Sequence, residues 1–163
     1  MNEYRTHNCG ELRIVDVGKI VKVAGWVQKI RNLGGMTFID LRDQFGITQI
    51  IIAENEELQK QTSELVTECV ISVEGTVLER TNKNTKILTG EIELKAEKIE
   101  LLGKCKNVLP FEINTDQEVR EDLRLEYRFL DLRNQRLHDT ILLRSKVLKT
   151  LRDRMDELGF TEI

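Results

Sequence analysis

The stretch KIVKVAGWVQKIR, residues 19–31, decides the fold class of this chain. Val21 and Val23 fall on one parity along it, and Trp26 falls on the other. Alternation with period two is typical of a β-strand, and apolar residues on both parities predict a long, curved strand with apolar contacts on both faces. Gly25 has no side chain to pack, so it permits a bend within the strand.

Four more strand-like stretches follow in the sequence. They are MTFIDLRD (36–43), ITQIIIA (47–53), CVISVEGTVLE (69–79) and GEIELKAEKIELL (90–102). The apolar parity of the last stretch switches between Ala96 and Ile99. An extra residue in one strand of a pair produces such a switch, so we expect a β-bulge there.

One helix is predicted between the third and fourth strands. In ENEELQKQTSELVTE, residues 54–68, Leu58, Leu65 and Val66 fall on one narrow helical stripe. The order is then strand, strand, strand, helix, strand, strand. This order predicts a mainly β fold, the five-stranded OB-fold barrel, with a small barrel of another topology as the alternative.

The character of the chain changes after the fifth strand. Residues 104–118 carry the only proline and no periodicity, which predicts a linker. Apolar residues at helical spacing then follow in two groups: Val119, Leu123, Tyr127 and Leu130, and later Leu148, Leu151, Met155 and Leu158. Gly159 is placed to end the last helix. The helix would have nothing after it in the sequence to cover its apolar side, so residues 119–163 are expected to be the start of a truncated second domain.

Composition excludes several classes of protein. The 25 Lys and Arg residues against 28 Asp and Glu residues give a net charge of −3, so a binder of nucleic acid through bulk positive charge is excluded. No apolar run approaches the roughly 20 residues of a membrane span, so we expect a cytoplasmic protein without a membrane partner.

Metal and catalytic sites are not expected in these residues. Cys9, Cys69 and Cys105 lack CxxC spacing, and His7 beside Cys9 is too small a set to predict a metal site. The interleaved acids and arginines of residues 120–133 predict an ion-paired surface rather than a paired-carboxylate active site.

Phe38 is the most informative candidate for function. It shares its parity with Asp40 and Arg42 rather than with the apolar Ile39 and Leu41. An aromatic ring on the polar face of a small barrel can stack on an unpaired base. The alternative is that the ring packs under a loop or against a second domain.

Three polar residues could join this ring in contacting nucleotides. Arg31 can meet a phosphate or a base edge, and Gln49 offers both a donor and an acceptor to a base. Glu93 could accept hydrogen bonds from the N–H groups of a guanine-like base. Each of the three could instead be an ordinary solvated side chain. The polar, basic loop TNKNTK (81–86) joins the fourth and fifth strands, where OB-folds commonly contact oligonucleotides.

Six motifs together resemble a known family. They are RTHNCGEL (5–12), VAGWV (23–27), FIDLRD (38–43), TGEIEL (89–94), LEYRFLDLR (125–133) and GFTEI (159–163). Over nearly its whole length the chain resembles the start of bacterial aspartyl-tRNA synthetases. GWV and FIDLRD are shared with asparaginyl and lysyl relatives, whereas RTHNCGEL and RFLDLR favour the aspartyl enzymes.

The resemblance implies a domain organisation and an activity for the full-length parent. Residues 1–103 would be the OB-fold that binds the tRNA anticodon loop, residues 104–118 a hinge, and residues 119–163 the opening of a class II catalytic domain. The full-length enzyme would be a homodimer that activates aspartate with ATP and Mg²⁺ and transfers it to tRNA. The motifs that bind ATP and aspartate are absent here, so this fragment is expected to contain no catalytic residue, metal or cofactor.

The resemblance also implies roles for the four candidate residues. Phe38 matches the ring that stacks on the central anticodon uridine, and Gln49 matches the side chain that reads that base's edge. Arg31 matches a nearby basic contact, and Glu93 matches the acidic residue that recognises the first anticodon base, a guanosine or its modified form. The chain departs from the family at residues 29–30, Lys-Ile, where many relatives have consecutive arginines.

Three other readings stay open at this point. The chain could belong to an asparaginyl- or lysyl-tRNA synthetase paralogue, which would prefer other anticodons. It could be a non-enzymatic OB-fold module that binds single-stranded nucleic acid in general, or a pure interaction domain that binds no RNA.

Overall fold

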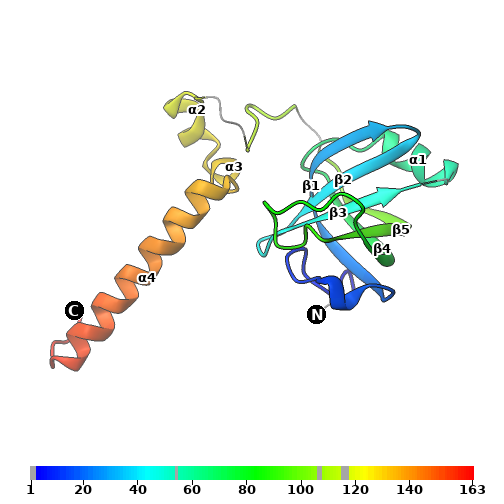
Figure 1. The fold of residues 1–163 in the computed structure, drawn as a ribbon. Helices are drawn as coiled ribbons and strands as arrows, with labels where there is room; N and C mark the ends of the chain where they lie inside the picture. Colours follow the sequence, from blue (N-terminus) through cyan, green and yellow to red (C-terminus); the bar gives the residue numbers. More distant parts are fainter. Residues whose placement is uncertain (1–2, 54, 106–107, 115–117) are drawn as a thin grey trace. The chain divides into compact units, whose positions relative to one another are not determined.

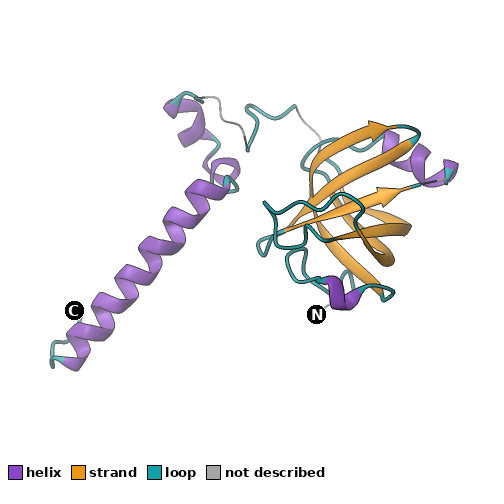
Figure 2. Ribbon diagram, viewed as in Figure 1, coloured by secondary structure: helices purple, strands orange, loops and turns teal. Residues whose placement is uncertain are grey.

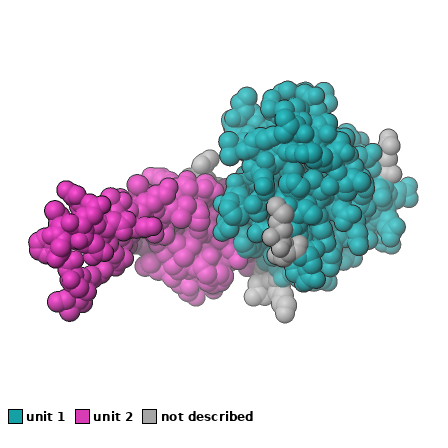
Figure 3. Space-filling view, turned by 90° about the horizontal axis from the view of Figure 1, so that it is seen from below, with its two compact units in different colours: residues 1–106 teal, residues 107–163 magenta. Residues whose placement is uncertain are grey.

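A computed structural model describes residues 3–53, 55–105, 108–114 and 118–163. The chain divides into two compact units, residues 1–106 and 107–163, which Figure 3 colours separately. Each unit is described by itself below. The limits predicted for the linker, residues 104–118, stay a prediction, and residues 106–107 and 115–117 of it lie outside the described residues.

The first unit is a closed five-stranded barrel (Figures 1 and 2). Its strands are β1 (Ile20–Leu33), β2 (Met36–Arg42), β3 (Ile47–Ile52), β4 (Val70–Glu79) and β5 (Ile92–Gly103). A 3₁₀ turn, η1 (Ile14–Asp16), precedes β1, and helix α1 (Glu56–Ser63) lies between β3 and β4. The neighbours around the barrel follow the order β1-β2-β3-β5-β4. The five predicted strands, the helix after the third and the OB-fold are thus confirmed.

Two features of strand pairing close this barrel. The long β1 pairs antiparallel with β4 through its first half and with β2 through its second half. β3 and β5 are parallel, and their register pairs Ile50 with Leu94 and Ile51 with Lys95. This short parallel contact joins the two ends of the sheet. Every other neighbouring pair of strands is antiparallel.

The change of face along β1 occurs at a bulge. The register with β2 shifts between Val27 and Lys29, which leaves Gln28 as the extra residue. Ile30 therefore packs against the core although its parity differs from that of the buried valines. Gly25 has another role, because a Cβ there would lie 2.3 Å from the carbonyl oxygen of Arg42. The glycine permits close approach of two backbones, and the bulge three residues later moves the apolar side chains to the other parity.

The bulge predicted in β5 is confirmed. Glu74 pairs with Lys98 and Gly75 with Ala96, so Glu97 is the extra residue. On either side of this residue the apolar side chains point into the barrel, which explains the switch in apolar parity.

The barrel core consists of the inward-pointing side chains of all five strands. Its fully buried members include Val21, Val23, Val27, Ile39, Leu41, Ile50, Ile52, Ile71, Val73, Val77, Ile92 and Leu94. Successive side chains of a strand alternate between the two faces. The residues between these core positions therefore point outward and are available for other roles.

Helix α1 differs from the predicted stripe at its C-terminal end. The Asn55 side chain caps its N-terminus by accepting a hydrogen bond from the Leu58 N–H at 3.0 Å. Leu58 is buried, as expected, but the helix ends at Ser63. Leu65 is buried from the turn beyond the helix, whereas Val66 is exposed. The predicted three-residue stripe was therefore wrong at Val66, because the chain leaves helical geometry before it.

The second unit is helical. It contains α2 (Glu121–Glu126), α3 (Arg128–Asp131) and α4 (Gln135–Glu157). Gly159 has a φ of +83°, and its N–H donates to the Asp156 carbonyl at 2.9 Å. The Phe160 N–H donates to the Met155 carbonyl at 3.0 Å. These two bonds form a Schellman motif, so the predicted end of the last helix is confirmed.

The apolar side chains of α4 are exposed. All residues of this helix are described, and none of them is buried. The exposed apolar set includes Ile141, Leu148, Leu151 and Met155, which fall on one helical stripe. Among the described helices of the chain, none combines the length and apolar character needed to cross a membrane.

Replacing Gly25 should destabilise the barrel. In the Gly25→Ala variant the new methyl group would overlap the Arg42 carbonyl oxygen, so β1 and β2 would have to separate. Overpacking of this kind costs about 1–3 kcal/mol, measurable as a lower midpoint in urea denaturation. The matched control is Gly103→Ala, whose Cβ would lie at an ordinary 3.6 Å from Val70. Equal midpoints for the two variants would contradict the close approach.

Candidate nucleic-acid interface

The outer surface of β1, β2 and β3 brings the first candidate residues together. Arg31 on β1 lies directly opposite Phe38 on β2, which in turn lies opposite Ile51 on β3. Directly opposed residues of neighbouring antiparallel strands point to the same side of the sheet. The buried Ile39, next to Phe38 in the chain, points into the barrel, so Phe38 points outward. Phe38 is half-buried on the outer surface, at the register position opposite Arg31.

A chain of hydrogen bonds runs across this surface from β1 to β5. Arg31 Nη2 lies 2.5 Å from Asp40 Oδ1 and 3.4 Å from Gln49 Oε1. Gln49 Nε2 donates to Glu93 Oε2 at 2.8 Å. We call these four side chains the polar row: Arg31 from β1, Asp40 from β2, Gln49 from β3 and Glu93 from β5. With Phe38 beside this row, the four residues predicted from the sequence all lie on one face: Arg31, Phe38, Gln49 and Glu93.

Asp40 is the member of this surface that was not singled out as a site residue. It lies opposite Gln49 in the β2–β3 register and forms an ion pair with Arg31. A signal was present in the sequence, because Asp40 shares its parity with Phe38 two residues earlier. What could not be read from the sequence was that Arg31 would lie within reach, since that depends on the pairing of β1 with β2.

Arg42 shares the parity of Phe38 but is not available for nucleotides. Its Nη2 lies 2.5 Å from Glu68 Oε1, and both side chains are buried. Its guanidinium also lies over the ring of Trp26, 5.7 Å from the centroid. These contacts supply the partners that a buried charge needs, and they occupy the guanidinium within the barrel.

Charge on the face is balanced. Lys29 lies opposite Asp40, and Lys95 lies beside Ile51 in the β3–β5 register. Both lysines are exposed and can meet phosphates at the edge of the polar row. With Asp40 and Glu93 among them, these cations do not form a strong positive field. Recognition by this face must therefore depend on stacking and on the pattern of donors and acceptors.

The loop between β4 and β5 is polar, as predicted, and partly ordered by Lys83. Lys83 Nζ lies 3.1 Å from Glu79 Oε1 and 3.3 Å from Glu91 Oε1. Hydrogen bonds to Glu79 and then to Glu91 raise the pKa of this exposed lysine. The ammonium group stays protonated and holds the loop to the ends of its two strands.

The cysteine near the N-terminus is structural. Cys9 is fully buried, and burial, together with the nearby carboxylate of Asp43, raises the pKa of its thiol well above the ordinary value. The thiol therefore stays protonated, unlike a reactive thiolate. Within the described parts of the chain, no group of three or more His, Cys, Asp or Glu side chains is arranged to hold a metal ion.

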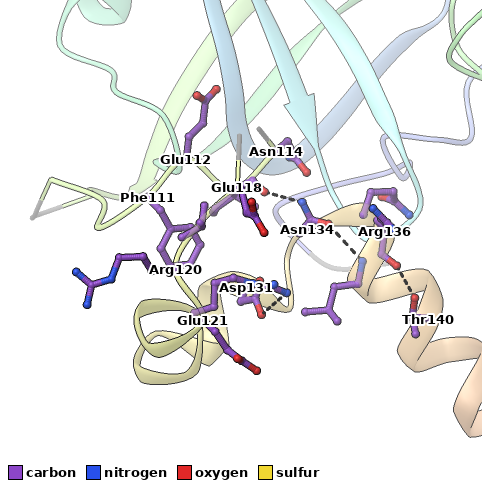
Figure 4. Close-up of a pocket in the computed structure, with 15 residues that line it drawn as sticks. Phe111, Glu112, Asn114, Glu118, Arg120, Glu121, Asp131, Asn134, Arg136 and Thr140 are labelled. Atoms are coloured by element: carbon purple, nitrogen blue, oxygen red, sulfur yellow. Dashed lines mark hydrogen bonds and ion pairs between the residues drawn. The ribbon is translucent and has the colours of Figure 1, made fainter. Parts of the chain in front are cut away.

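A hollow lies within the helical unit (Figure 4). It has a volume of about 1220 Å³, and Asp131 and Asn134 are among its lining residues. Asp131 is only 4% exposed and is bound by Arg124, at 3.0 Å, and by Arg128. Asn134 Nδ2 donates to the Ile113 carbonyl at 2.8 Å. The predicted ion pairs of this segment are present, but Asp131 is buried rather than on the surface, and Arg124 from α2 and Arg128 from α3 hold its carboxylate.

The barrel and its outer face define a class of protein. A closed five-stranded sheet with an outward-facing aromatic residue, an amide and charged groups on one face is typical of domains that bind oligonucleotides. The chain belongs to the family of OB-fold nucleic acid binding domains, whose family description matches residues 21–102. A second family, tRNA synthetases class II (D, K and N), matches residues 120–163.

Similarity to individual proteins extends over nearly all of the chain. It is 50% identical over 161 residues to an aspartate–tRNA(Asp/Asn) ligase of Thermotoga neapolitana, covering 98% of this chain and 27% of that protein. It is 46% identical over 165 residues to an aspartate–tRNA ligase of Streptomyces coelicolor, covering 100% of this chain and 28% of that protein. The chain thus spans about a quarter of the length of these relatives and corresponds to their N-terminal region.

The fold also matches a solved structure. An asparaginyl-tRNA synthetase from Pyrococcus horikoshii complexed with asparaginyl-adenylate superposes with a TM-score of 0.78 at 27% identity. The match covers 96% of this chain and 35% of that one.

The hydrogen bond between Gln49 and Glu93 should be measurable as coupling. Because the amide donates to a carboxylate, the Gln49→Ala and Glu93→Ala changes should be non-additive by about 1 kcal/mol in the free energy of unfolding. Urea denaturation of both single variants and the double variant measures this. Gln49→Ala with Glu100→Ala is the control cycle, since Glu100 lies seven residues farther along β5 and should be additive. Additivity in both cycles would show that the bond contributes nothing.

Proposed function

We propose that this chain recognises the anticodon of tRNA as part of an aspartate–tRNA ligase. The observation that carries the proposal is the position of Phe38 beside the polar row on the outside of an OB-fold barrel. The names of the relatives, which cover the whole chain at 46–50% identity, support the substrate class.

In this proposal each side chain of the face has a distinct role. The ring of Phe38 stacks on the central anticodon base, a uridine, and the amide of Gln49 binds that base's edge. Glu93 accepts hydrogen bonds from the first anticodon base, a guanosine. Arg31 adds a cation close to the central nucleotide, and its ion pair with Asp40 keeps the guanidinium in place. Lys29 and Lys95 contact phosphates at the edges of the face.

The chemical steps are assigned to a longer protein. We propose that such a protein is a homodimer that activates aspartate with ATP and Mg²⁺ and transfers it to tRNA. The buried carboxylate of Asp131 does not suit those steps, because Arg124 and Arg128 already neutralise it. The contribution of this chain is recognition at a distance from the reaction.

A related enzyme that charges asparagine is the second candidate. The observation in its favour is the superposition on an asparaginyl-tRNA synthetase. The anticodons of tRNA(Asp) and tRNA(Asn) share their first two bases, guanosine and uridine, and differ in the third. The four proposed contacts concern the shared bases and do not separate the two candidates. In a comparison of stem-loops that differ only in the third base, a preference for cytosine there favours the aspartyl enzyme, and a preference for uracil favours the asparaginyl enzyme.

Removing the ring of Phe38 should weaken RNA binding. Stacking on an aromatic side chain contributes about 1–3 kcal/mol per base, so Phe38→Ala should lower the affinity for an anticodon stem-loop roughly 5- to 150-fold. Fluorescence anisotropy with a labelled stem-loop carrying the anticodon GUC measures the change.

Phe45→Ala is the matched control for this experiment. Phe45 is an exposed phenylalanine in the loop between β2 and β3, outside the polar row. The Phe45→Ala variant should bind the stem-loop with the affinity of the unmodified chain. If Phe38→Ala and the unmodified chain bind the stem-loop with equal affinity, the stacking proposal is refuted. A chain that binds GUC and unrelated single strands equally well would instead be a general single-strand binder.

The chain by itself should not activate an amino acid. We expect no aspartate-dependent exchange of pyrophosphate into ATP by the 163 residues, and exchange by a longer protein that adds the rest of a class II catalytic domain. Exchange by the isolated chain would refute this division of labour, and exchange by the longer protein with asparagine or lysine instead would refute its assignment to aspartate.

A further inference from the structure

The amide of Gln49 is held from two sides. Its side chain is buried, with the residue only 5% exposed. Arg31 Nη2 faces Oε1 at 3.4 Å, and Glu93 Oε2 faces Nε2 at 2.8 Å. Asp40 in turn holds Arg31 Nη2 at 2.5 Å, so the guanidinium does not depend on Gln49 for its position.

The two neighbours allow only one orientation of the amide. A guanidinium has donors and no acceptor, whereas an ionised carboxylate has acceptors and no donor. Rotating the amide by half a turn would set its NH₂ group against Arg31 and its oxygen against the carboxylate of Glu93. Both hydrogen bonds would be lost and both contacts would become repulsive.

The locked amide keeps one N–H and one acceptor lone pair for a ligand, because each of its polar atoms has used only one bond with its neighbour. Uracil presents an acceptor at position 4 and an N–H at position 3. Cytosine presents the opposite pattern at the same two positions, an NH₂ group and an acceptor nitrogen. A free amide could rotate to suit either base. A fixed amide presents its oxygen on the side of Arg31 and its NH₂ group on the side of Glu93, so it suits only one of the two patterns when stacking on Phe38 holds the base in one orientation. The proposed function names uracil as that base.

We propose that Arg31 and Glu93 lock the Gln49 amide, and that this lock makes the face prefer uracil to cytosine at the central anticodon position. The inference rests on the proposed function. It assigns Glu93 a positioning role for the central base in addition to its contact with the first base. Recognition of the two bases is therefore coupled through one hydrogen bond.

The test compares stem-loops GUC and GCC, which differ only in the central base. For the unmodified chain we expect roughly a tenfold preference for GUC, the size of a good two-bond discrimination. In Glu93→Gln, residue 93 can serve as donor or acceptor, so the preference should fall at least about threefold. Both stem-loops have the same first base. A weaker contact with that base therefore lowers the affinities for GUC and GCC alike and leaves their ratio unchanged. The ratio therefore separates positioning from direct contact.

Two further variants complete the test. Glu100→Gln removes the same charge from an exposed site on β5 and should keep the full preference. Asp40→Asn weakens the hold on Arg31 without altering residue 93, so it should also lower the preference, by a smaller factor. Circular dichroism establishes that each variant is folded, and Asp40→Asn answers the question if Glu93→Gln does not fold.

The outcomes distinguish the two proposals. If the unmodified chain binds GUC and GCC equally, the proposed function fails and the lock fails with it. If the unmodified chain prefers GUC and both Glu93→Gln and Asp40→Asn keep the full ratio, anticodon recognition stands and the lock is refuted. A reduced ratio in Glu93→Gln or Asp40→Asn, with the full ratio in Glu100→Gln, supports the lock.

Discussion

The parallel contact between β3 and β5 is the constraint on which the rest of this structure depends. It joins Ile50 to Leu94 and Ile51 to Lys95, and thereby closes the sheet. Closure buries the inward side chains of all five strands together, and it brings Gln49 to Glu93 across 44 residues of chain. An open sheet with the same strands would leave these two groups unconnected. The same short contact therefore supports both the core and the recognition face.

The near-neutral charge of the chain favours recognition through a pattern of hydrogen-bond donors and acceptors over recognition through a positive electrostatic field. The chain carries a net charge of −3, and the cations near Phe38 are interleaved with Asp40 and Glu93. A strongly basic surface would bind any nucleic acid, whereas this face offers a ring and a fixed set of donors and acceptors. A carboxylate on such a face repels phosphates, so its presence there favours a role in selecting bases over a role in affinity.

Much of the fold and part of the site could be predicted from local pattern. Period-two alternation located all five strands and placed Phe38 on the outer face, and the switch in parity between Ala96 and Ile99 located a bulge. Prediction failed where contacts between distant segments decide. Val66 is exposed because α1 ends early, and Asp131 is buried with arginines from α2 and α3 on its carboxylate. Asp40 was on the correct face, but its partner Arg31 lies on another strand.

What the amino-acid sequence alone determined is which residues form strands, which parity faces the core, and the family to which the barrel belongs. The strands and their parity follow from backbone geometry and from the removal of apolar side chains from water. Both leave a pattern that can be read within a few neighbouring residues of the sequence. Tertiary structure decided which outward side chains become neighbours, and hence which way the amide of Gln49 points. That orientation depends on a donor from β1 and an acceptor from β5, which meet only when the barrel closes.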